Sequence, residues 1–314
     1  MLERIKKPTF TAPLLVLVVG ALSAAAQTLL KNHAFGSKEE LFLTYTVAEI
    51  LVFILPGIVY VKLKKKGYAA DMRLVSFGFS KLPLVLRMFF VMAVGAVLIN
   101  LFSTGQAFGA GLSRSATFLS GGEYLSDART ILYVGLTLGV VPAFAEEFLF
   151  RGILLYEYRA YGAVTSVIVT SLFFAMMHFD FALFPYYFVS GLALGFTAYT
   201  ARSAFAAATL HALYNLFALF ALPLVLNFIS LEAGVVVFYL AGVFFLLFLM
   251  LALGECERLF AGYSTSGMTS DKRVERKKLS YPPFLQIFTP TFLVCLLLFV
   301  LGILQVIRYP SNMI

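Results

Sequence analysis

The stretch 232–253, EAGVVVFYLAGVFFLLFLMLAL, carries no charged residue after Glu232 and is apolar on every side. A run of about 20 such residues can cross a hydrocarbon core of about 30 Å as an α-helix. The strands of a membrane barrel would instead alternate apolar and polar residues. Residues 232–253 therefore predict a membrane-spanning helix.

The composition agrees with this interpretation over the whole chain. The 314 residues are 61% hydrophobic and 13% charged, whereas about a quarter of an ordinary soluble protein is charged. Run length predicts about nine spans, at 10–30, 41–61, 82–102, 130–156, 161–178, 183–200, 205–226, 232–253 and 284–307. We expect an all-α polytopic membrane protein with about eight to nine transmembrane helices and no sizeable soluble domain.

The net charge of +8 comes from short Lys and Arg clusters between the apolar runs. Such clusters are typical of cytoplasmic loops, so they argue for a lipid bilayer rather than nucleic acid as the partner. The inner clusters are Arg4, Lys6 and Lys7; Lys62, Lys64, Lys65, Lys66, Arg73 and Lys81; and Arg258, Lys272, Arg273, Arg276, Lys277 and Lys278. We expect the N-terminus in the cytoplasm and a plasma-membrane location.

Two other features concern the ends and the linkers. The basic start of the chain, the apolar stretch and the small residues Ala24, Ala25 and Ala26 within the first span resemble a signal peptide with a cleavage site, but the length of the span favours a retained helix. Residues 254–281 are predicted to form the longest polar linker. Cys256 in this linker and Cys295 in the last span have neither the spacing of a metal-ligand pair nor a plausible disulfide geometry.

Ionisable residues inside a span are candidates for function because burying them is expensive. They concentrate in three strings: EEFLFR at 146–151, FAMMH at 174–178 and HALYN at 211–215. Glu49 and Arg87 are isolated in the second and third spans, where they could simply reach an interface or a neighbouring helix.

Helix geometry assigns different surroundings to these groups. Glu147 and Arg151 are four residues apart, so they can form an ion pair on one helix face. Glu146 is rotated about 100° from Glu147 and is the freer carboxylate. His211 and Asn215 are also four apart and share a face.

Depth along straight helices gives a less simple picture. At 1.5 Å per residue, Glu146 and His178 lie roughly 22 and 25 Å above the turn that joins their helices, so they are level. His211 lies only about 12 Å above its own turn, and Asn215 about 18 Å. His211 is therefore expected lower than the other groups unless that turn is recessed or the helix tilts.

A carboxylate, two imidazoles and an amide in mid-membrane can activate water, bind a metal or relay protons. Burial and the nature of imidazole make Glu and His suitable bases for water. Asn and His can donate hydrogen bonds to a developing oxyanion. The parts for peptide hydrolysis are all present.

The three strings resemble the EExxxR, FxxxH and HxxxN motifs of the CAAX protease and bacteriocin-processing family of intramembrane endopeptidases. The resemblance covers about a third of the chain, and the motifs fall in order on separate predicted helices. It implies a catalytic four-helix core at 129–226. Residues 1–128 then hold transmembrane helices without an assigned motif, and 227–314 hold the last helices with the basic linker.

The resemblance also implies residue roles. Glu146 and His178 correspond to the pair thought to activate water, and His211 with Asn215 to the pair that stabilises the oxyanion. Glu147 and Arg151 would support the site. The implied substrate is a membrane protein or a lipidated peptide, and no cofactor is expected.

Three alternatives remain at this point. A zinc peptidase could use Glu146, His178 and His211 as ligands, although HExxH is absent from the chain. A nonenzymatic membrane adaptor or bacteriocin-immunity protein would need none of these residues for chemistry. A proton-coupled transporter is least expected because no paired repeats are visible.

Overall fold

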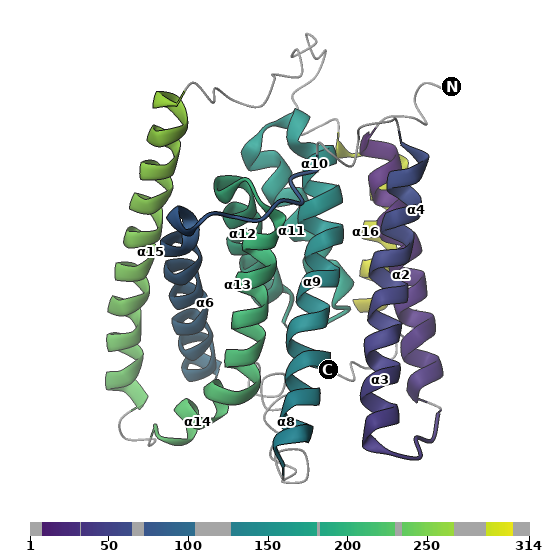
Figure 1. The fold of residues 1–314 in the computed structure, drawn as a ribbon, viewed down its shortest axis with the longest axis horizontal. Helices are drawn as coiled ribbons and strands as arrows, with labels where there is room; N and C mark the ends of the chain where they lie inside the picture. The colour runs from purple at the N-terminus through teal and green to yellow at the C-terminus, as the bar shows by residue number, and fades with distance from the viewer. Residues whose placement is uncertain are drawn as a thin grey trace.

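The computed structural model describes residues 8–31, 33–64, 72–103, 127–180, 183–229, 234–266 and 287–303. These residues form helices, and no strand occurs among them (Figure 1). Six helical segments in the described ranges are long and apolar enough to cross a membrane, and shorter apolar helices accompany them. The prediction of an all-α polytopic membrane protein is confirmed.

The elements follow one another closely along the chain, and several join into longer spans. In chain order they are α2 (Pro8–Lys31); α3 (Lys38–Glu49), π-helical η1 (Ile50–Ile54) and α4 (Leu55–Leu63); 3-10 helix η2 (Phe79–Lys81) and α6 (Leu82–Ser103); α8 (Ala128–Val134), π-helical η3 (Gly135–Val140), α9 (Val141–Glu147), π-helical η4 (Phe148–Leu154), α10 (Leu155–Tyr158) and 3-10 helix η5 (Arg159–Tyr161); α11 (Ala163–Met177); α12 (Phe184–Ala201); α13 (Ala204–Leu216), π-helical η6 (Phe217–Ala221) and α14 (Leu222–Asn227); α15 (Gly234–Thr265); and α16 (Pro290–Ile303).

Short polar residues set several helix starts. The Ser37 side chain accepts a hydrogen bond from the Glu40 amide and caps α3. Asp127 caps α8 in the same way, through the Thr130 amide. Such caps satisfy backbone N–H groups that have no partner within their own helix. They fix where the two spans that carry carboxylates at mid-depth begin.

The centre of the molecule is formed by α9, α11, α12 and α13, which pack on one another. In Figure 1, α6 and α15 lie together on one side of this group, and α2, α3, α4 and α16 lie on the other. The backbones of α11 and α12 approach closely at Gly191, where a Cβ atom would lie 3.0 Å from the Ser171 Cα. These four helices lie within residues 129–226, the segment that contains the three motifs.

The predicted polar linker at 254–281 is wrong in its first part, because α15 continues to Thr265. Glu255 is buried and pairs with Arg87 of α6, with 2.8 Å between Oε2 and Nη1. The Tyr263 hydroxyl donates to the Thr200 carbonyl at 2.9 Å. These contacts with α6 and α12 keep the polar segment helical, and Cys256 lies buried within it rather than in a linker.

The surface of α15 agrees with contact to lipid. Val235, Val243 and Met250 are 66%, 64% and 71% exposed, and they belong to a long apolar helix.

Part of the predicted basic clusters lies outside the described residues. These residues are Arg4, Lys6 and Lys7, Lys65 and Lys66, and Lys272, Arg273, Arg276, Lys277 and Lys278.

Candidate active site

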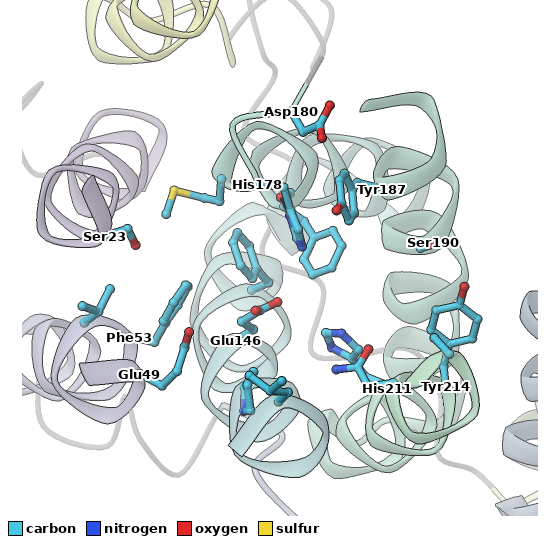
Figure 2. Close-up of a pocket in the computed structure, with 18 of the residues that line it drawn as sticks. Ser23, Glu49, Phe53, Glu146, His178, Asp180, Tyr187, Ser190, His211 and Tyr214 are labelled. Atoms are coloured by element: carbon cyan, nitrogen blue, oxygen red, sulfur yellow. Dashed lines mark hydrogen bonds between the residues drawn. The ribbon is translucent and has the colours of Figure 1, made fainter. Parts of the chain in front are cut away.

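A cavity of about 260 Å³ lies among α2, the α3–η1 span, α9, α11, α12 and α13. Glu146, His178, His211 and Asn215 all line it. Figure 2 shows Glu146, His178 and His211 directed toward a common space from three different helices. The structure thus brings together the four residues that the motifs singled out.

Glu146 is the carboxylate that reaches this space. Its Oε2 atom is buried, and no hydrogen-bond partner for it occurs among the residues that the structure describes. Pro142 lies one turn earlier and also lines the cavity. Because proline has no N–H, the preceding turn lacks one backbone bond, and the helix there is the π-helical η3. The Oε2 atom of Glu146 is thus available to accept a hydrogen bond from a molecule in the cavity.

Glu147 turns away from the cavity and makes the predicted ion pair. Its Oε1 lies 2.6 Å from Nη1 of Arg151, and both side chains are buried. Arg151 also donates through Nη2 to the Gly191 carbonyl at 2.8 Å and lies over the Phe174 ring, 4.7 Å from its centroid. This arginine therefore ties η4 to α11 and α12.

The same carboxylate oxygen has a second partner that the spacing did not indicate. Nδ1 of His211 lies 3.1 Å from Oε1 of Glu147. A carboxylate oxygen only accepts, so Nδ1 carries the hydrogen and Nε2 is the ring nitrogen left for the cavity. Glu147 thus orients a cavity residue as well as balancing Arg151.

His178 is the C-terminal capping residue of α11. Its Nδ1 donates to the Phe174 carbonyl at 2.8 Å, which leaves Nε2 as an acceptor in the neutral ring. The Phe174 ring, one turn earlier on α11, lies 4.7 Å from the imidazole between ring centroids. The Tyr187 ring stacks on the imidazole with 3.8 Å between centroids. The backbone then turns at Phe179, whose φ of 52° ends the helix.

His211 lines the cavity although straight helices predicted it lower, and the turn that precedes its helix is buried. Ser203 at this turn is fully buried. Its hydroxyl donates to the Val75 carbonyl, and the Ala204 amide donates to the Arg73 carbonyl at 3.0 Å. The segment before α6 therefore covers the turn from which α13 starts.

Asn215 reaches the cavity from the end of α13. Its amide nitrogen donates to the Gly139 carbonyl of η3 at 3.3 Å. An amide nitrogen has two hydrogens, so one remains for a group in the cavity. Tyr214 also lines the cavity, and its hydroxyl is buried without a hydrogen-bond partner among the described residues.

The sequence motifs did not predict that residues of α2 and α3 line the cavity. Ser23, Gln27 and Glu49 line the same cavity as Glu146. Glu49 was a span carboxylate without an assigned contact, and its Oε2 is buried with no partner within the described part of the chain. The signal was an ionisable residue in a span, but nothing in the spacing joined it to the motif helices.

The residues predicted as alternative zinc ligands do not form a metal-binding group. Within the described residues, no cluster of three or more His, Cys, Asp or Glu side chains is placed to hold a metal ion. Glu146, His178 and His211 are therefore not grouped as three ligands of one metal ion among the described residues.

Comparison with known proteins gives one match. Residues 128–217 match the family described as type II CAAX prenyl endopeptidase, Rce1-like. No curated protein and no solved structure matches the chain. The matched segment contains all three motifs, from Glu146 to Asn215, so the family predicted from them is confirmed there.

Proposed function

We propose that this chain, which carries an Rce1-like CAAX endopeptidase segment at 128–217, hydrolyses a peptide bond inside the membrane with Glu146 and His178 as the water-activating pair. One observation carries the proposal. Four of the six polar residues of the three motifs line one cavity within a multi-pass helical protein. The family supports a membrane peptidase in general, and the residue roles are our own inference.

The water-activating step follows from the two groups that face the cavity with acceptors. A water molecule between them would donate one hydrogen to the Glu146 carboxylate and the other to Nε2 of His178. Glu146 takes the proton as the oxygen attacks the carbonyl carbon. His178 holds the water in line, because the Phe174 carbonyl fixes its tautomer and Tyr187 fixes its ring plane.

The oxyanion step uses the other two residues. The second N–H of the Asn215 amide is free to donate to the developing negative charge. Nε2 of His211 donates to the same oxygen when the ring carries both protons, and Glu147 holds the ring in that orientation. Arg151 keeps Glu147 in place through a 2.6 Å contact. The proposed mechanism uses no metal.

The location of the cavity suggests the class of substrate. It lies among helices that cross the membrane, so a membrane protein or a lipidated peptide could reach it from the bilayer. We place the N-terminus in the cytoplasm and the protein in the plasma membrane, because Lys and Arg are concentrated in the loops on that side.

The test is cleavage by purified protein in liposomes. The probe is an internally quenched peptide that ends in a farnesylated CAAX sequence, and mass spectrometry identifies the bond that is cut. Glu146→Ala and His178→Ala should each abolish cleavage while keeping the folded yield, because they remove the activating groups without stranding a buried charge. The matched control is His33→Ala, since His33 is exposed and is not among the residues that line the cavity.

A parallel experiment needs no assumption about the substrate. Membrane peptides are compared between cells that express the wild type and cells that express Glu146→Ala. Processing that stops only in the variant supports the proposal. If purified Glu146→Ala cleaves the peptide at the wild-type rate, the catalytic assignment is refuted. An intact cellular phenotype in this variant would favour the adaptor or immunity role. Loss of cleavage with a chelator and its return with zinc would refute the metal-independent mechanism.

A further inference from the structure

We propose that Glu49 is a further catalytic residue of this site, which gives its proton to the leaving nitrogen of the scissile peptide bond. The role rests on the proposed function, because it completes the hydrolysis that Glu146 begins. No motif contains Glu49, which lies outside the segment that matches the family.

The first observation is the place of the side chain. Glu49 is the last residue of α3, and it lines the same cavity as Glu146 and His211. Figure 2 shows Glu146 between Glu49 and His211. The two carboxylates therefore face a common space, and Glu49 lies on the side away from the residues proposed to bind the oxyanion.

The second observation is the lack of a partner. The Oε2 atoms of Glu49 and Glu146 are both buried, and neither has a hydrogen-bond partner among the described residues. A buried polar atom without a partner is expensive and is usually kept for a reason. Both oxygens are thus available to a molecule that enters the cavity.

The third observation is the backbone that carries these residues. Single π-helical turns inside α-helices are rare and are frequent at functional sites. The π-helical η1 begins directly after Glu49, η4 begins directly after Glu147, and η6 begins two residues after Asn215. Glu49 therefore shares a local backbone feature with residues of the motifs.

The position of the attacking water decides which carboxylate holds a proton. Two buried carboxylates that line one cavity would repel each other if both were charged, so the pair is most stable with one proton. Arg151 does not decide which of them holds it, because its charge is balanced by Glu147. In the proposed mechanism Glu146 shares the water with His178 and accepts its proton, so Glu49 is the carboxyl group that holds a proton when the water is bound. This gives one base and one acid.

The proton balance of the reaction then closes. Water adds its oxygen to the carbonyl carbon and gives one proton to Glu146. The C–N bond of the tetrahedral intermediate breaks, its electron pair stays on nitrogen, and that nitrogen takes the proton of Glu49. The products are a carboxylic acid and an amine. Proton transfer from Glu146 to Glu49 restores both groups, so one water is consumed.

The experiment separates amide cleavage from ester cleavage. An amine leaves only after it is protonated, whereas an ester alkoxide needs far less help from an acid. The probes are the farnesylated quenched peptide and the same peptide with an ester at the scissile position. Glu49→Gln should cleave the amide about 100- to 10,000-fold more slowly than the wild type and the ester at a rate within about tenfold. Glu146→Gln should lose both reactions.

The controls address folding and charge. Glu39→Gln removes a carboxyl group from the exposed start of the same helix and should leave both rates unchanged. Glu49→Asp keeps the acid and should recover part of the amide activity. Each variant is compared with the wild type for its melting temperature in detergent.

The outcomes separate this proposal from the proposed function. If Glu49→Gln cleaves the amide at the wild-type rate, or loses amide and ester cleavage equally, the role of Glu49 is overturned. The mechanism proposed for Glu146 is not affected by either result. Ester cleavage by Glu146→Gln overturns the proposed function itself. A wild type that cleaves neither probe in liposomes counts against both.

Discussion

Replacing Arg151 with alanine should lower the stability of the folded protein more than any loss of a surface charge. Arg151 is buried, and it donates to Glu147 at 2.6 Å and to the Gly191 carbonyl at 2.8 Å. Its removal leaves the Glu147 carboxylate buried without its main partner. Breaking a buried ion pair from one side typically costs about 3–5 kcal/mol.

The structure places the expected cost at the lower end of this range. Oε1 of Glu147 still has Nδ1 of His211 at 3.1 Å, so a partial partner remains after Arg151 is lost. A cost of about 3 kcal/mol lowers the ratio of folded to unfolded protein by roughly 100-fold, since each 1.4 kcal/mol is a factor of ten. The loss of the Gly191 contact also loosens the approach of α12 to η4.

The assay is the fraction of monodisperse protein that survives heating in detergent, measured by size-exclusion chromatography. Arg151→Ala should melt several degrees below the wild type, and Arg129→Ala at the exposed start of α8 should match the wild type. Glu147→Gln combined with Arg151→Gln should recover part of the loss, because two amides bury no charge. Equal melting of Arg151→Ala and Arg129→Ala would refute the reasoning.

Two further predictions concern the oxyanion site and the orientation. Asn215→Ala should lower the turnover number by about 100- to 1,000-fold with little change in apparent substrate affinity, and a defect in affinity alone would make Asn215 a substrate-binding residue. An impermeant maleimide added to intact cells should label Glu39→Cys but should label Lys62→Cys only after permeabilisation. These residues lie at opposite ends of one span, and Cys256 and Cys295 are buried and give little background. The reverse labelling pattern would place the N-terminus outside.

The spans were predictable because hydrophobic run length is a local property of the chain. The predicted spans at 130–156 and 205–226 agree with Ala128–Tyr158 and Ala204–Asn227 to within two residues at each end. Run length failed at 254–265, where polar residues made a helix look like a linker. Glu255 is stabilised there by Arg87, a residue 168 positions away, and such a contact is invisible to a local pattern.

Pairs within one helix were also predictable. The spacing of four between Glu147 and Arg151 was enough to predict their ion pair, which the structure confirms. Phe174 and His178 are also four residues apart on one helix, and their rings are in contact. These contacts depend only on the pitch of an α-helix, so the order of residues decides them.

The amino-acid sequence by itself determined that this is a helical membrane protein and which polar residues its helices must bury. Tertiary structure decided how these residues meet. It brought His211 to the cavity wall, it joined His211 to Glu147, and it placed Glu49 on the same cavity as Glu146. The relative height of residues on two helices, and the faces that the helices turn toward each other, depend on packing across the whole bundle. Each helix can slide and rotate without a change in its own hydrogen bonds.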